Sequence, residues 1–262
     1  MSNTAKRRGS RAVEDYLKTI WGLSEWTSEL AVSNAAVADR LGVSTSSASE
    51  MVRKLTASGL VRHERWGGVE LSDLGVRAAM AVVRRHRLLE TFLSRQLGYS
   101  WDEVHEEADV LEHAVSDLMI ERIDRLLGFP HRDPHGDPIP TPDGTVHRPQ
   151  ARPLASLQPG EQGYVARIVD ESSELLRWLA GQDLRLDTAV EVRSQQPFGG
   201  PLVVAVEVDT PGSAAEVDLG LQAVTSLWVA SSRPDNPDEP PPQSSRQRPG
   251  CPYHDCLHRS VS

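Results

Sequence analysis

Six side chains that can bind a metal ion recur at helical spacing between residues 86 and 113. In a first predicted helix, His86 and Glu90 are four residues apart and therefore share a face. In a second, positions i, i+4, i+7 and i+8 also share a face, and they hold His105, Asp109, Glu112 and His113. Imidazoles and carboxylates together can bind a divalent cation. A solvated acidic helix face has the same composition, so the spacing alone leaves both interpretations open.

A metallohydrolase and a metal-storage or structural dimer are two classes of protein that could use these side chains. A metallohydrolase could hold a catalytic ion through His105, Asp109 and His113 and leave one coordination position open. It would also need a general base and a substrate pocket, and the sequence has no HExxH motif, nucleophile elbow or Gly-rich phosphate loop. A metal-storage or structural dimer would explain the ligands but not the DNA-binding motif described below.

Length and composition narrow the class further. A chain of 262 residues is long enough for two or three domains. No apolar run approaches the ~20 residues of a membrane span, and the N-terminal segment lacks the apolar core of a signal peptide. Both cysteines, Cys251 and Cys256, lie near the C-terminus, so the body of the chain has no disulfide. We therefore expect a cytoplasmic protein that does not enter a membrane.

Charge is distributed unevenly. The formal net charge is −9, yet residues 1–95 hold 15 Lys and Arg against 10 Asp and Glu. A basic N-terminal third on an acidic protein indicates that this end meets a polyanion.

The basic third also carries a helix-turn-helix pattern. Ser33 and Ser44 are placed to cap two short helices, over residues 34–41 and 45–58. Strand-like alternation around Trp66-Gly67-Gly68 then predicts a β-hairpin wing. The second helix has one apolar face and one polar face suited to the major groove of DNA. The candidate DNA-contacting residues are Ser44, Thr45, Ser46, Ser47, Ser49, Glu50 and Lys54.

Two long apolar helices follow the wing. The first is predicted over residues 73–96, and the second opens at the capping box Ser100-x-x-Glu103 and runs to about Leu127. Both are too apolar for an isolated pair, so we expect a homodimer. Residues 129–153 contain seven prolines and predict a linker or extended segment, with exposed side chains at His131, His135 and His147.

The C-terminal half has a different pattern. Short apolar runs between residues 160 and 230, interrupted by one helix over 173–180, predict a small β-barrel. The Pro-rich composition after residue 230 predicts a disordered tail. A soft-metal site in that tail is conceivable, but composition favours a loose end for its Cys251, His254, Cys256 and His258.

In this order, the elements resemble the diphtheria-toxin-repressor (DtxR) family of metal-dependent transcriptional regulators. The resemblance is strongest to the manganese transport regulator (MntR) branch in its longer form. It covers residues 11–230 and is carried by EDYLKTIW, VADRLGVSTSSASEMVRKL, RRHRLLETFL, VHEEADVLEHAVSD and FPHRDPHGDPIP. It implies a mainly α protein with a small β domain. The implied parts are a winged helix-turn-helix over 1–75, a helical dimerisation and metal-binding domain with a Pro-rich linker over 76–150, an SH3-like (FeoA-like) barrel over 151–230, and a disordered tail over 231–262.

The resemblance also implies two metal sites. The regulatory site would consist of Asp15, Asp109, Glu112 and His113, and the ancillary site of His86, Glu90 and His105. Further ligands from the barrel would be Glu171 and Glu174. Three carboxylates and one imidazole are hard ligands that suit Mn²⁺, whereas iron-type members carry sulfur at two of these positions. Fe²⁺ and an iron-dependent repressor are the alternatives within the family.

Two positions depart from the manganese branch. Asp109 stands where its members usually have Glu, which changes the reach of that ligand. Lys18 stands where some shorter members have a second carboxylate, which argues against a binuclear site built on that residue.

The expected function follows from the position of Asp15, which lies on the first helix. A cation that joins it to the dimerisation domain would hold the two winged helices at one separation. Dimers of this kind contact operator half-sites about 34–36 Å apart or a multiple. We therefore expect a manganese-dependent repressor of metal-uptake genes that binds double-stranded operator DNA as a homodimer.

Overall fold

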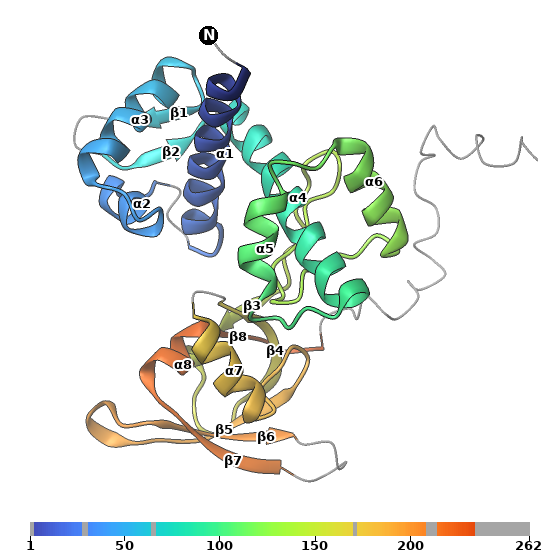
Figure 1. Cartoon of the computed structure of the whole chain (residues 1–262). Helices are drawn as coiled ribbons and strands as arrows, with labels where there is room; N and C mark the ends of the chain where they lie inside the picture. Colours follow the sequence, from blue (N-terminus) through green and yellow to red (C-terminus); the bar gives the residue numbers. More distant parts are fainter. Residues whose placement is uncertain (1–2, 28–30, 64–66, 170–171, 208–213, 234–262) are drawn as a thin grey trace, which may run out of the picture.

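The computed structural model describes residues 3–27, 31–63, 67–169, 172–207 and 214–233, and only the backbone of residues 3–10. Three parts follow one another along the chain: a helical part with a small hairpin, a second helical part, and a part built on a sheet (Figure 1). Within the described ranges, no helix is both long and apolar enough to cross a membrane. The tail was predicted over 231–262, and all of it after residue 233, with its cysteines and histidines, lies outside the described residues.

The N-terminal part is a winged helix-turn-helix, as predicted. Ser33 accepts a hydrogen bond from the backbone N–H of Ala36 and Ser44 from that of Ser47, so both N-caps are confirmed. Hydroxyl caps favour helix starts because they satisfy an N–H group that has no partner within the helix. Trp66, in the predicted turn of the wing, lies outside the described residues. The elements are α1 (Asn3–Glu25), α2 (Asn34–Arg40), α3 (Thr45–Ala57), β1 (Val61–His63) and its antiparallel partner β2 (Val69–Leu71).

The next element is the long helix α4 (Asp73–Leu97). The predicted cap is confirmed, because Ser72 accepts a hydrogen bond from the N–H of Gly75. A Cβ atom at Gly75 would lie 1.9 Å from the carbonyl oxygen of Leu60, so glycine allows the helix to begin directly against the wing. The first half of α4 packs into the same core as α1, and its second half packs into a separate core. One continuous helix therefore links the two helical parts.

The prediction of a single helix that runs to about Leu127 is wrong. The chain forms α5 (Val104–Leu111) and then α6 (Asp117–Leu126), with a break between them. Ser116 caps α6 by accepting a hydrogen bond from the N–H of Met119, and a cap there favours a new helix start over continuation. The pairing of Ser100 with Glu103 before α5 is present. As a consequence, Glu112 is the C-cap of α5 and His113 lies in the turn that follows it.

Most residues from 130 to 140 are buried, so the predicted exposure of His135 is wrong: its side chain is buried. The segment follows β4 (Gln162–Ile168) closely, since a Cβ atom at Gly136 would lie 2.2 Å from the carbonyl oxygen of Ala166. Gly136 also has a φ of 92°, a conformation that favours glycine. His131 and His147 are exposed, as predicted.

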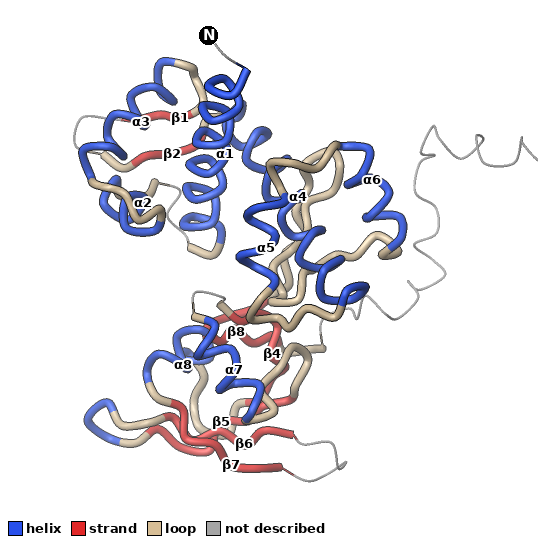
Figure 2. The backbone as a smooth tube through the Cα atoms, viewed as in Figure 1, coloured by secondary structure: helices blue, strands red, loops and turns tan. Residues whose placement is uncertain are grey.

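The C-terminal part is an antiparallel six-stranded sheet in the order β3-β8-β4-β5-β6-β7 (Figure 2). Its core is formed by apolar side chains from both the strands and the helices. Strand β7 was not predicted, because its exposed face is polar and its apolar alternation is short. The domain boundaries at residues 75 and 150 stay predictions. Besides β4, the elements are β3 (Ala151–Pro153), β5 (Ala189–Gln195), β6 (Leu202–Glu207), β7 (Ala214–Leu219), β8 (Leu227–Ala230), α7 (Ser173–Gly181), α8 (Leu221–Ser226) and two 3-10 turns (Leu154–Ser156 and Pro197–Gly199).

The end of α1 contacts this sheet. The Trp26 ring lies 5.1 Å from that of Trp228, and the guanidinium of Arg167 lies 4.8 Å from the Trp26 ring. Asp137 accepts hydrogen bonds from both Trp26 Nε1, at 2.7 Å, and Arg167 Nε, at 2.6 Å. The packed segment 129–141 therefore joins the N-terminal part to the C-terminal part.

Candidate metal centre

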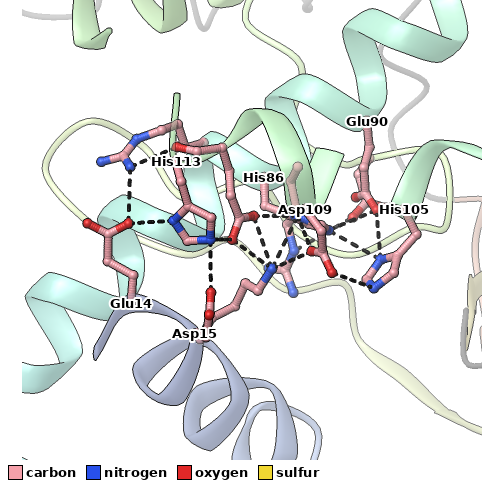
Figure 3. Close-up of polar contacts among 12 residues, drawn as sticks. Glu14, Asp15, His86, Glu90, His105, Asp109 and His113 are labelled. Carbon is pink, nitrogen blue, oxygen red and sulfur yellow. Dashed lines mark hydrogen bonds and ion pairs between the residues drawn. The ribbon is translucent and has the colours of Figure 1, made fainter. Parts of the chain in front are cut away.

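A cluster of imidazoles and carboxylates lies where α1, α4 and α5 meet (Figure 3). In one group, the ligand atoms of Asp15, Glu112 and His113 all lie within 4.8 Å of one another. In a second group, the ligand atoms of His86, His105 and Asp109 satisfy the same criterion. We call these the Asp15 group and the His86 group.

The Asp15 group joins two parts of the chain. Asp15 belongs to α1, whereas Glu112 and His113 lie in the break after α5. His113 Nε2 lies 2.8 Å from Asp15 Oδ1 and 3.3 Å from Glu112 Oε1. Burial raises the pKa of Asp15, and the nearby His113 partly offsets this effect. An ion bound here would therefore contact α1 and the segment after α5 at once.

The His86 group lies against α4. Asp109 Oδ1 is 3.3 Å from His86 Nδ1, and Asp109 Oδ2 is 3.8 Å from His105 Nε2. Glu90 also approaches both imidazoles, at 2.9 Å from His86 Nε2 and 3.2 Å from His105 Nδ1. Burial alone would lower the pKa of His86, but the charge of Glu90 and the hydrogen bonds to Glu112 and Glu90 outweigh it and raise the pKa to about 9. A metal ion at His86 must therefore displace a proton near neutral pH.

The ligands predicted for the regulatory and ancillary metal sites lie close together, but the structure groups them differently from the prediction. Asp109, predicted with the regulatory site, groups with His86 and His105. The two groups nevertheless touch, because Glu112 Oε2 lies 2.6 Å from His86 Nδ1. Of the barrel candidates, Glu174 is exposed on α7 and belongs to none of the described groups, and Glu171 lies outside the described residues.

A third group escaped the sequence analysis. Glu90, Asp133 and His135 also bring their ligand atoms within 4.8 Å of one another, and all three are buried. Burial raises the pKa of Asp133 to about 8, and the nearby charges of Glu90 and Asp137 act in the same direction. The available signal was the run from Asp133 to Asp137, which holds an imidazole between two carboxylates. Its proline and glycine indicated a linker instead.

Glu14 was also missed. Its carboxylate lies 2.8 Å from Nδ1 of His113, on the opposite side of the ring from Asp15 (Figure 3). A carboxylate that accepts from one ring nitrogen orients the ring and favours metal binding through the other nitrogen. The side chain of Arg85 lies 3.8 Å from the same carboxylate. The signal in the sequence was the Glu14-Asp15 pair, of which only the second residue was considered.

Lys18 lies between the two groups. Its Nζ donates to Asp109 Oδ1 at 2.6 Å and to the two oxygens of Glu112 at 2.9 and 3.0 Å. Burial alone would raise the pKa of Asp109 and of Glu112, but the positive charge of Lys18 and the contacts of His86 hold both below their usual range. Both carboxylates are therefore ionised at neutral pH, as ligands must be.

The donors of all three groups are carboxylate oxygens and imidazole nitrogens. Such a set suits Mn²⁺ and Fe²⁺ and lacks the thiolates that select soft metals. The residues present therefore fit a hard or intermediate divalent cation. The chain would hold it through Asp15, Glu112 and His113, through His86, His105 and Asp109, or through both groups.

The predicted DNA-contacting face is available on α3. Ala48, Val52 and Leu55 face the core, and the opposite face is exposed. Lys54 Nζ pairs with Glu50 Oε1 at 2.7 Å on the exposed face. An exposed pair of this kind contributes little stability, so Lys54 remains free to contact a phosphate. The exposed candidate residues are Ser44, Thr45, Ser46, Ser47, Ser49, Glu50 and Lys54.

Comparisons with known proteins agree with this arrangement. Residues 10–69 match the N-terminal DNA-binding domain of iron-dependent repressors, residues 72–141 their metal-binding and dimerisation domain, and residues 152–214 the FeoA domain. Over 219 residues the chain is 37% identical to the iron-dependent repressor IdeR of Mycobacterium leprae, a match that covers 81% of this chain and 90% of the relative. The match to IdeR of Mycobacterium bovis is also 37% identical but spans 127 residues, which is 48% of this chain and 54%, about half, of the relative.

A solved structure described as a manganese-dependent transcriptional repressor in complex with manganese is also similar. It is 51% identical, has a TM-score of 0.79, and covers 84% of this chain and 99% of its own. A winged helix joined through a helical metal-binding domain to a FeoA domain is the architecture of metal-dependent repressors. The chain belongs to the diphtheria-toxin-repressor (DtxR) family. None of the relatives named here is an enzyme, so the metallohydrolase interpretation gains no support from them.

Proposed function

We propose that this protein is a manganese-dependent transcriptional repressor that binds operator DNA as a homodimer. The observation that carries the proposal is the contact of Asp15, on α1 of the winged helix, with Glu112 and His113 after α5. A cation held by all three side chains would replace the repulsion between two carboxylates with a tie between the two helical parts. Metal binding and DNA binding would then be coupled reciprocally.

Exposed apolar side chains support the dimer. Leu118, Met119 and Leu126 of α6 are 44–61% exposed, and Phe129 directly after it is 54% exposed. Several large exposed apolar residues on one short helix and its C-terminal end are typical of an interface. A symmetric partner would cover these residues and place two winged helices for two operator half-sites.

The ligand chemistry supports manganese, with iron as the alternative. The M. leprae relative is named as an iron-dependent repressor, and the solved relative that is 51% identical is described in complex with manganese. All three groups here lack sulfur, and oxygen-rich sites suit Mn²⁺. The cytoplasmic location and the metal-uptake genes as targets stay predictions.

The test is a mobility-shift titration on the DNA upstream of the protein's own gene. Parallel titrations contain Mn²⁺, Fe²⁺ under anaerobic conditions, Zn²⁺ or a chelator. The proposal expects a metal-dependent shift with Mn²⁺ effective at the lowest free concentration. A shift that is equally strong in chelator would overturn metal dependence, and Fe²⁺ acting at a lower free concentration than Mn²⁺ would favour the iron-dependent alternative.

A further inference from the structure

Lys18 occupies a position that electrostatics would assign to a cation. It contacts one carboxylate from each candidate group: Asp109 of the His86 group and Glu112 of the Asp15 group. It uses both oxygens of Glu112, which is fully buried, and it is itself only 21% exposed. The ammonium also lies 3.4 Å from His86 Nδ1. The same oxygen atoms would be needed by a metal ion in either group.

The surroundings allow Lys18 to leave this position. A cavity of about 370 Å³ lies beside it and is also lined by Asp15, His86, Glu90 and Asp109. A lysine has a flexible four-carbon stem and a strongly hydrated charge, so it can release one set of partners and turn toward solvent. The positive charge would otherwise remain within contact distance of a bound divalent cation and repel it.

We propose that Lys18 is a built-in cation that holds Asp109 and Glu112 together in the metal-free protein and must be displaced for the metal ion to bind. This inference rests on the proposed function, because it describes how the same centre is regulated. Lys18 would then set the metal concentration at which the protein responds, because the ion must compete with an ammonium already in place.

The position of Lys18 on α1 extends the consequence. It lies three residues after Asp15 on the same helix, so it ties α1 to α5 without a metal ion. Metal binding would break the contacts of Lys18 with Asp109 and Glu112, and Asp15 would then connect α1 to the segment after α5 through the metal ion. The metal-free protein would therefore not separate its two helical parts completely, and the exchange would change their relative position.

The experiment compares the parent with Lys18→Met, which removes the charge and keeps an unbranched side chain only one atom shorter. Lys18→Arg retains a positive charge at the same position. Arg193→Met removes one charge from an exposed side chain of β5, far from the centre in sequence and in fold. For each protein, Mn²⁺ affinity is measured by calorimetric titration. The melting temperature is measured in chelator and in saturating Mn²⁺.

The proposal expects Lys18→Met to bind Mn²⁺ roughly tenfold more tightly or better, because the competing charge is gone. Its melting temperature should fall in chelator, where Asp109 and Glu112 lose their counter-charge, and should recover in Mn²⁺. Lys18→Arg keeps the competing charge, so its affinity should not rise above that of the parent. Arg193→Met should stay within about twofold of the parent affinity.

An ordinary structural ion pair would behave differently. Lys18→Met would then lower the melting temperature equally with and without Mn²⁺ and leave the affinity unchanged, and that result overturns the inference. A Lys18→Met protein too unstable to titrate is replaced by Lys18→Gln, to which the same expectations apply. If the parent itself binds no Mn²⁺, the proposed function fails; if the parent binds and the variants match it, only the role of Lys18 fails.

Discussion

Asp15 Oδ1 lies 2.8 Å from His113 Nε2, although Asp15 belongs to the first helix of the winged-helix part and His113 follows α5. The second ring nitrogen of His113, Nδ1, lies 2.8 Å from the carboxylate of Glu14. Two consecutive acidic residues of α1 therefore contact this imidazole. A short break in the helical domain is thereby placed directly against the helix that supports the DNA-binding motif. We expect this contact to couple metal binding to DNA binding.

Asp15→Ala should separate metal binding from DNA binding. His113 and Glu112 remain, so the variant should still bind Mn²⁺, although more weakly. The operator affinity gained from metal should fall by roughly 5–150-fold, which corresponds to a typical allosteric coupling. The measurement is operator binding with and without saturating Mn²⁺, with metal occupancy determined separately. Asp218→Ala, an exposed carboxylate on β7, is the matched control. A variant with the full metal-dependent gain would eliminate the bridging mechanism.

Asp109→Cys should change the preference among metals. A thiolate is a softer ligand than a carboxylate, so the response should shift from Mn²⁺ toward Fe²⁺, Co²⁺ or Zn²⁺. The measurement is the free concentration of each metal that gives half-maximal operator binding, under reducing and anaerobic conditions. Asp109→Ser, which removes the carboxylate without adding sulfur, should weaken all four responses and is the control. An unchanged ranking would show that Asp109 does not contact the ion.

Lys54→Ala should weaken binding to every DNA sequence. Lys54 is exposed on α3, where we expect it to contact the phosphate backbone. Glu50 is its only contact among the described ion pairs. Loss of one phosphate contact should reduce the slope of log affinity against log salt concentration by about one. Glu50→Ala should have the opposite effect, since it removes a negative charge beside DNA. If both the affinity and the slope equal those of the parent, Lys54 lies outside the interface.

The affinity for Mn²⁺ should rise with pH. Burial would lower the pKa of His86, but Glu90 and Glu112 raise it to about 9, so the metal-free imidazole is protonated at neutral pH. Because the ion needs the neutral imidazole, each ion bound at His86 releases about one proton, and log affinity should rise toward one unit per pH unit between about pH 6.5 and 8.5. His86→Gln should flatten this dependence, whereas His147→Gln, at an exposed position, should not. A slope unaffected by His86→Gln would exclude His86 as the titrating ligand.

The same shift has a consequence for stability in chelator. A pKa raised from 6.5 in the unfolded chain to about 9 in the folded protein stabilises the fold fully below pH 6.5, and this contribution is lost as the pH rises through about 9. The melting temperature of the metal-free protein should therefore decline across this interval. A melting temperature that rises across it would contradict a protonated, paired His86.

Local sequence alone determined most of the fold. Ser33, Ser44 and Ser72 begin helices because a hydroxyl beside the first turn satisfies an N–H group, and this signal needs no distant partner. The apolar periodicity of α3 and α4 determined which faces are buried. The types of the metal-ligating residues were also evident, because imidazoles and carboxylates at helical spacing are visible in any window of the chain.

Tertiary structure decided how those residues combine. The contacts made by other helices divide the predicted set: Asp109 lies with His86 of α4 and His105, whereas Glu112 and His113 lie with Asp15 of α1. His135 became buried because the segment 129–141 packs against β4, a contact that local composition does not encode. Lys18 was visible in the sequence only as a departure from a pattern. Its contacts with Asp109 and Glu112 depend on how α1 packs against α4 and α5, because charges distant in the chain interact only after the fold has brought them together.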